Sequence, residues 1–112
     1  MNLTHLSYYT SEQLQASIPN QQVCEKLSSL YALFSDSTRL KIIVSLLCQE
    51  MCVGDLSQLL NTNQTTISHQ LKILKNAGAV TSTRKNKFIF YKVNNKIISQ
   101  LLIHGVDFIS SK

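Results

Sequence analysis

Residues 55–78 read DLSQLLNTNQTTISHQLKILKNAG, and this stretch decides the fold. Its apolar residues recur at helical spacing on both sides of a polar centre. They are Leu56, Leu59 and Leu60 before that centre and Ile67, Leu71, Leu74 and Ala77 after it. The pattern predicts two short amphipathic helices joined by a tight turn.

The residues of the expected turn support this interpretation. Asn61 can adopt a left-handed backbone at little cost, and Asn63 is a good N-cap for the second helix. Gly78 stands where a glycine commonly ends a helix. Two helices joined in this way form a helix-turn-helix.

The outer face of the second helix is rich in hydrogen-bonding and cationic side chains. Groups of this kind read base edges or hold phosphates, and the start of such a helix reaches deepest into the major groove. His69 could instead pack against a neighbouring element. The predicted DNA contacts in this region are Asn63, Gln64, Thr65, Thr66, Ser68, His69, Gln70, Lys72 and Lys75.

The charge distribution also favours nucleic acid. The chain has 112 residues, enough for one domain, with a formal net charge of +5. No acidic residue lies between Asp55 and Asp107, whereas that interval holds Lys72, Lys75, Arg84, Lys85, Lys87, Lys92 and Lys96. An uncompensated basic block around a helix-turn-helix is typical of DNA binding, although a lone run of charge is more often a solvated face.

Beyond Gly78 the apolar period changes. Residues 80–85 and 88–93 are β-branched and aromatic runs on either side of Asn86, which predicts a two-stranded hairpin. Arg84, Lys85 and Lys87 would form its basic tip and contact the DNA backbone or the minor groove. The expected fold is therefore mainly α, an α+β winged helix.

The segments before the helix-turn-helix are also predicted to be mainly helical. We expect residues 1–20 to form an arm with one short helix, and residues 21–112 to form the DNA-binding and dimerisation domain. Helical spacing of Val23, Leu27, Leu30, Tyr31 and Phe34 predicts the first helix of that domain. A core helix should follow over about residues 38–49, burying Leu40, Ile43, Val44 and Leu47, with Ile42 and Leu46 broadening its apolar face.

The last helix, from residue 94 to about residue 110, is apolar over more of its circumference than one small core can hide. This surplus predicts a symmetric dimer.

Other function classes find little support. The first residues do not resemble a signal peptide, and no apolar run is long enough to cross a bilayer, so we expect a cytoplasmic protein without a membrane partner. Three cysteines in no scaffold-like pattern fit a reducing compartment. There is no glycine-rich phosphate loop and no nucleophile–base constellation, which argues against an enzyme.

Three motifs in this order resemble the ArsR/SmtB family of bacterial repressors. They are ALFSDSTRLKII at residues 32–43, MCVGDL at residues 51–56 and SHQLKIL at residues 68–74. The resemblance covers about residues 23–110. It implies a winged-helix homodimer, held by its first and last helices, that binds an inverted-repeat operator and leaves it when an inducer binds. Asn61 stands where the family usually has glycine.

The resemblance does not supply the inducer. One metal site of the family uses two cysteines in a Cys-Val-Cys-Asp motif that begins at Cys52, but this chain has Gly54 at the second position. The other uses Asp and His near the start of the last helix with His and an acid near its end. Asn95, Ile97 and Phe108 occupy three of those places, and isoleucine and phenylalanine cannot ligate zinc.

A thiol-based sensor remains an alternative for the inducer response. Cys52 directly precedes a predicted helix, whose N-terminus favours the thiolate that binds metal or oxidises. Cys24, Cys48 and Cys52, together with His5, could bind zinc or another thiophilic metal or act as a redox sensor. Cys24 and Cys48 could equally be small core hydrophobes. The sequence alone assigns no cofactor.

His104 and Asp107 share a face of the last helix and could form a two-subunit metal site, although a surface hydrogen bond is the commoner arrangement. Two functions of other classes also remain. A winged helix can bind protein instead of DNA, but the acid-free basic block argues against that. A thiol-redox enzyme requires a closer pair of cysteines than Cys48 and Cys52.

Overall fold

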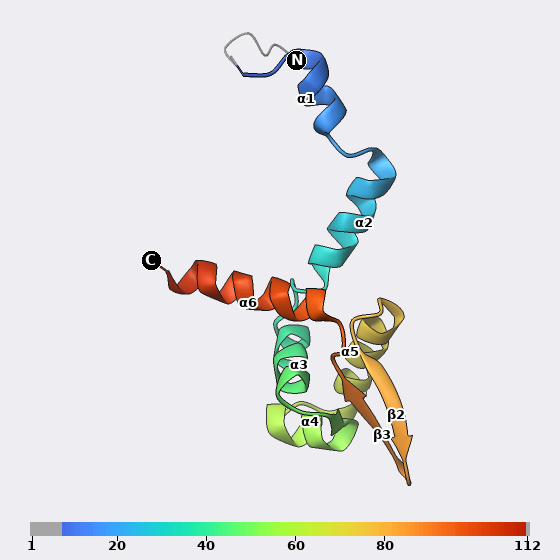
Figure 1. Cartoon of the computed structure of the whole chain (residues 1–112). Coiled ribbons are helices and arrows are strands. Elements are labelled where there is room, and N and C mark those ends of the chain that lie inside the picture. Colours follow the sequence, from blue (N-terminus) through green and yellow to red (C-terminus); the bar gives the residue numbers. More distant parts are fainter. Residues whose placement is uncertain (1–7, 112) are drawn as a thin grey trace. The chain divides into compact units, whose positions relative to one another are not determined.

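The structure is a computed structural model that describes residues 8–111 of the chain (Figure 1). The chain divides into two compact units, one up to Ala32 and the other from Leu33 onwards.

The first unit contains two helices, α1 (Ser11–Ser17) and α2 (Gln21–Ala32). Thr10 and Gln13 form a capping box at the start of α1, in which each side chain accepts a hydrogen bond from the other residue's backbone N–H. The short helix expected before residue 20 is therefore confirmed. The next helix begins at Gln21 as expected but ends at Ala32, before Phe34.

The core of the second unit is built by three helices, α3 (Ser37–Cys48), α4 (Val53–Leu60) and α5 (Gln64–Asn76). Asp36 caps α3, because its Oδ2 accepts a hydrogen bond of 2.9 Å from the backbone N–H of Arg39. The side chains of these helices that are buried almost completely are Ile42, Ile43, Leu46, Leu56, Ile67, Leu71 and Leu74.

Three residues expected on buried faces are exposed. Val44 of α3 and Leu59 of α4 are 47% and 58% exposed, and Ala77, just after α5, is also exposed. Only one side of α3 meets α4, α5 and the sheet, and that side carries Ile42, Ile43 and Leu46, so Val44 points away from them. Leu59 lines an open cavity at the surface of the unit.

The turn between α4 and α5 has the predicted geometry. Asn61 adopts the left-handed conformation, with φ 50° and ψ 49°. Asn63 caps α5, because its Oδ1 accepts a hydrogen bond of 2.8 Å from the backbone N–H of Thr66. Gly78, with φ 78°, reverses the chain after α5.

The sheet has one strand more than the sequence suggested. β2 (Thr81–Lys85) and β3 (Phe88–Lys92) form the expected hairpin, and the short strand β1 (Met51–Cys52) pairs with β3 on its other side. All pairings are antiparallel. A strand of two residues is too short to produce a periodic pattern, so β1 could not be recognised from the sequence.

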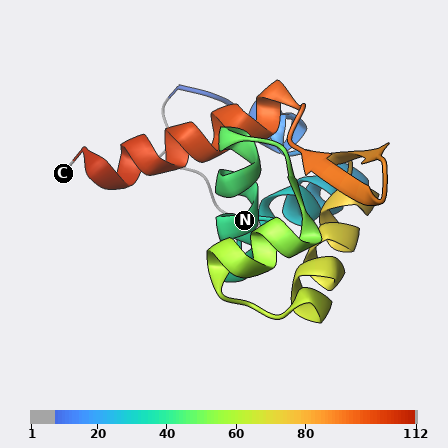
Figure 2. The same cartoon turned by 90° about the horizontal axis from the view of Figure 1, so that it is seen from below.

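The last helix, α6 (Lys96–Ser110), begins at the N-cap Asn95. Ile98 is buried, whereas much of the apolar surface is open: Ile97, Ile103, Val106, Phe108 and Ile109 are all more than half exposed. The second half of α6 extends beyond the other elements of its unit (Figures 1 and 2). Across residues 8–111, we find no helix long and apolar enough to span a membrane.

Candidate nucleic-acid interface

The outer face of α5 presents most of the predicted DNA contacts to solvent. Gln64, Thr65, Ser68, His69, Lys72 and Lys75 are exposed, as is the cap residue Asn63. Thr66 and Gln70 are half buried, because they flank the stripe of Ile67, Leu71 and Leu74 that packs into the core. One face of α5 therefore packs into the core, and the opposite face is exposed to solvent.

A groove of about 430 Å³ runs between this face and the hairpin. Gln64 and Ser68 border it from α5, and Lys87 borders it from the hairpin. Its other walls are Cys52, Val53, Gly54, Phe88, Ile89 and Tyr91. The groove brings predicted base-reading residues and a predicted phosphate-binding lysine to one surface.

The strand register fixes which hairpin side chains face α5. Ser82 pairs with Tyr91 and Arg84 pairs with Ile89, so these four residues lie on one face of the sheet. Lys75 Nζ of α5 donates a hydrogen bond of 2.6 Å to Ser82 Oγ, which identifies this as the face toward α5. Lys75 thus links the helix to the hairpin, a contact that the sequence pattern did not indicate.

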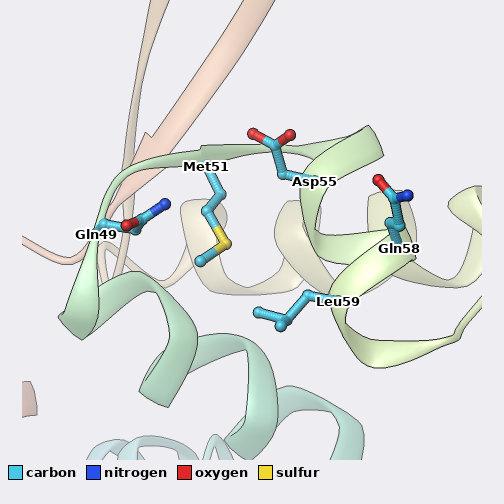
Figure 3. A pocket seen from close by; sticks show the side chains of 5 residues that line it. All are labelled: Gln49, Met51, Asp55, Gln58 and Leu59. Carbon is cyan, nitrogen blue, oxygen red and sulfur yellow. The ribbon is translucent and has the colours of Figure 1, made fainter.

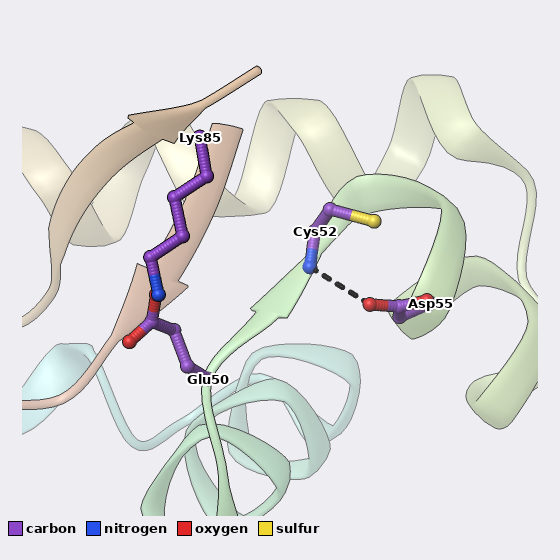
Figure 4. Close-up of polar contacts among 4 residues, drawn as sticks. All are labelled: Glu50, Cys52, Asp55 and Lys85. Atoms are coloured by element: carbon purple, nitrogen blue, oxygen red, sulfur yellow. Dashed lines mark hydrogen bonds and ion pairs between the residues drawn. The ribbon is translucent and has the colours of Figure 1, made fainter. Parts of the chain in front are cut away.

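Lys85 has a different position from the other two tip cations. It pairs with Phe88 and lies on the opposite face, where its Nζ is 2.7 Å from Glu50 Oε1 (Figure 4). Its Nζ also lies 5.4 Å from the centre of the Phe90 ring. Glu50 was not among the predicted site residues, and only the pairing of β1 with β3 brings it to this place.

The cysteines occupy three separate settings. Cys52 is the N-cap of α4 and borders the groove, and its backbone N–H donates a hydrogen bond of 3.2 Å to Asp55 Oδ2 (Figure 4). Cys48 is exposed at the end of α3, and Cys24 belongs to the first unit. All three are free thiols.

The described residues of one chain do not fit a complete metal site. Between residues 8 and 111, no group of three or more His, Cys, Asp or Glu side chains could hold a metal ion. Gly54 cannot provide the second thiolate of the family's cysteine motif. His104 and Asp107 are both exposed on α6, and His5 lies outside the described residues.

A second, smaller cavity of about 300 Å³ lies beside β1 and α4 (Figure 3). Met51 and Leu59 point into it, and Gln49, Asp55 and Gln58 complete its lining. None of the predicted DNA contacts borders this cavity, so the groove beside α5 is the better candidate for the functional surface.

Comparison with known proteins agrees with this geometry. The family model described as "Bacterial regulatory protein, arsR family" matches residues 36–82, from the cap of α3 to the start of the hairpin. The transcriptional repressor SdpR of Bacillus subtilis is 32% identical over 75% of this chain and 93% of its own length. The chain belongs to the arsR family of bacterial regulatory proteins.

Other members of the arsR family extend the comparison. The cadmium resistance regulatory protein CadC of Listeria innocua is 35% identical over 73% of this chain and 70% of its own. The crystal structure of the repressor BigR from Xylella fastidiosa superposes with a TM-score of 0.70 and 27% identity, over 91% of this chain and 97% of that one.

Membership of the arsR family gives the chain its general function. It is a DNA-binding transcriptional repressor with a winged-helix fold, and it is not an enzyme. Repressors of this family bind DNA and are typically dimers. The hairpin formed by β2 and β3 is accordingly the wing, and α5 is the recognition helix.

Proposed function

We propose that the protein is a cytoplasmic homodimeric repressor that binds an inverted-repeat operator through α5 and the wing and is released by an inducer. The observation that carries this proposal is the groove beside α5, because one surface joins Gln64 and Ser68 to Lys87. Residues 21–112 would contain the elements for DNA binding and dimerisation, with residues 1–20 as an N-terminal extension.

The contacts divide by chemistry. Side chains in the first half of α5 and at its N-cap would read base edges or nearby phosphates, since a recognition helix enters the major groove by its N-terminal residues. These are Asn63, Gln64, Thr65, Thr66, Ser68, His69 and Gln70. Lys72, Lys75, Arg84 and Lys87 would attract phosphates regardless of sequence, and the same role was expected of Lys85.

The proposed dimer would bury the apolar surfaces that a single chain leaves open. In α2, Val23, Leu27 and Tyr31 follow one another at four-residue spacing and are between 41% and 56% exposed. The exposed apolar residues of α6 form a second such surface. A twofold arrangement that covers both would place two recognition helices on two half-sites.

The DNA-reading role can be tested by selecting the tightest duplex from a random-sequence library and measuring its affinity by fluorescence anisotropy. We expect Gln64→Ala to change which sequences are preferred, because it removes a base-reading amide. Lys87→Ala should weaken binding to all sequences alike. It should also reduce the salt slope, which is the slope of log binding constant against log salt concentration, by about 0.9, the contribution of one phosphate contact.

Wild-type binding that did not depend on salt would contradict the electrostatic part of the proposal. Failure of the wild-type protein to select any duplex would instead favour the alternative, a winged helix that binds protein.

A thiol-based inducer response is the second candidate, and the position of Cys52 favours it. Cys52 borders the groove together with Gln64 and Ser68, so a metal or oxidant bound there would meet the proposed DNA surface. An inducer must bind the low-affinity state more tightly than the DNA-bound state. The inducer on this candidate would be zinc or another thiophilic metal held by Cys24, Cys48 and Cys52 across two subunits, or one held by His104 and Asp107, and it would have to meet this requirement.

Titration with zinc, cadmium, arsenite and hydrogen peroxide in the DNA-release assay tests this candidate. Release that is lost in the variant with all three cysteines changed to serine would support it. Release that is unchanged in this variant would exclude the thiols, and loss in His104→Ala would then point to α6.

A further inference from the structure

We infer that Lys85 is a wing-positioning residue, held by Glu50 and Phe90, and does not contact DNA phosphates as the other wing cations do. This inference rests on the proposed function and refines it, because it separates one basic residue of the wing tip from its neighbours Arg84 and Lys87.

The first argument is the face of the sheet. Arg84 shares its face with Ser82, which receives the hydrogen bond from Lys75 of α5. Lys85 is the next residue along β2, so its side chain points to the opposite face. The side of the wing that faces the recognition helix therefore carries Arg84 and not Lys85.

The second argument is the contact of the ammonium group. Lys85 Nζ lies 2.7 Å from Glu50 Oε1 and 5.4 Å from the centre of the Phe90 ring, a distance at which cation–π attraction operates. The Lys85 side chain remains 55% exposed, which means that it lies along the sheet surface without being buried in it.

The third argument concerns the carboxylate of Glu50. The Glu50 side chain is 30% exposed, but its Oε1 is shielded from solvent and forms no aligned hydrogen bond. The Lys85 ammonium is thus the charge that compensates this oxygen. Removing the ammonium would leave a shielded carboxylate oxygen without compensation, which is unfavourable, and moving it to a phosphate would have the same effect.

The charge pattern of the chain singles out this pair. Glu50 and Asp55 are the only acids between Asp36 and Asp107, and Asp55 caps its own helix by accepting from Cys52. Glu50 lies between α3 and β1, just after Gln49, the C-cap of α3 (Figure 4). The ion pair therefore joins the wing to the segment that leads from α3 to β1 through a side-chain contact, in addition to the short ladder between β1 and β3.

The test compares Lys85→Met with Lys87→Met, since methionine keeps an unbranched apolar chain and removes only the charge. On a duplex selected by the wild-type protein, Lys87→Met should reduce the salt slope by about 0.9. Lys85→Met should leave the slope unchanged and weaken binding about two- to fivefold, the effect expected from losing an exposed ion pair that holds the wing.

Two further variants distinguish positioning from a general loss of charge. Lys85→Arg should retain wild-type affinity, because arginine can keep both the ion pair and the contact with Phe90. Glu50→Gln combined with Lys85→Met should bind no more weakly than Lys85→Met alone, since the uncompensated carboxylate is gone. Additive losses in the double variant, or a slope reduced as much in Lys85→Met as in Lys87→Met, would overturn the inference.

Absence of wild-type DNA binding would contradict the proposed function and not this contact. The contact is therefore also tested by thermal unfolding of the same single and double variants without DNA. Non-additive changes in unfolding midpoint would support the pair, and strictly additive changes would overturn it.

Discussion

Two asparagines have a left-handed backbone in the described part of the chain, Asn61 with φ 50° and Asn86 with φ 58°. Asn61 turns the chain between α4 and α5, and Asn86 turns it at the tip of the wing. Asparagine tolerates this region better than most residues, because its short polar side chain can form local hydrogen bonds. The departure from the family's usual glycine at Asn61 therefore preserves the turn.

Substitution at Asn61 should reveal how much the left-handed backbone at this position costs in free energy of unfolding. We expect Asn61→Ala to reduce the free energy of unfolding by about 1 kcal/mol, because alanine keeps the Cβ that disfavours this backbone and lacks the short polar side chain that lets asparagine adopt it. Asn61→Gly should be close to neutral. Urea unfolding followed by circular dichroism measures both values. Asn76→Ala, at an exposed helical position, is the matched control and should not be destabilising.

At the scale of single residues, much of the helix-turn-helix could be predicted from the sequence. The cap at Asn63, the left-handed turn at Asn61 and the reversal at Gly78 follow from local preferences that neighbouring residues determine. The Glu50–Lys85 pair could not be predicted in the same way. It depends on the register of a three-stranded sheet, and its partners are far apart in the sequence.

At the scale of elements, helical periodicity located α2 to α6 but did not determine how far each face is buried. Val44 and Leu59 satisfy the apolar pattern and are nevertheless exposed, because the pattern records which residues are apolar and not where neighbouring elements pack. The strand β1 was missed for a related reason. Its two residues become a strand only because β3 lies beside them.

The start of α3 offers a test at this scale. Asp36→Ala should reduce the free energy of unfolding by about 1 kcal/mol, because the backbone N–H of Arg39 loses its acceptor in the first turn of the core helix. Asp36→Asn keeps an acceptor oxygen in the same place and should retain most of the stability. Thermal unfolding of both variants checks this expectation. Equal losses would show that the charge of Asp36, and not its capping hydrogen bond, stabilises the helix.

At the scale of the whole molecule, the last helix was predicted to carry more apolar residues than one core can bury, and the structure shows where these residues are exposed. The exposed apolar side chains concentrate on α2 and α6, outside the compact helix-turn-helix and its sheet. A single chain gains nothing from exposing Phe108 and Ile109 on one helix, whereas a second copy could cover both. The sequence could predict the surplus, but a single chain cannot show the symmetric packing that would bury it.

A charge on this surface should therefore separate the subunits. Phe108 is 77% exposed in the single chain, so Phe108→Glu should not disturb the fold but would place a carboxylate in the proposed interface. We expect sedimentation velocity to show a dimer for the wild-type protein and a monomer for this variant at the same micromolar concentration. The two half-sites of an operator would then be bound independently, and the gain from linking two recognition helices, about a hundredfold or more, would disappear.

The matched control is Gln100→Glu, which adds the same charge to an exposed polar position of α6. This variant should remain dimeric and bind the full operator like the wild-type protein. Circular dichroism should give the same helix content for both variants, because neither position contributes to the core. A Phe108→Glu protein that stayed dimeric would show that the subunits meet elsewhere, and Val23→Glu on α2 would then test the other exposed apolar surface.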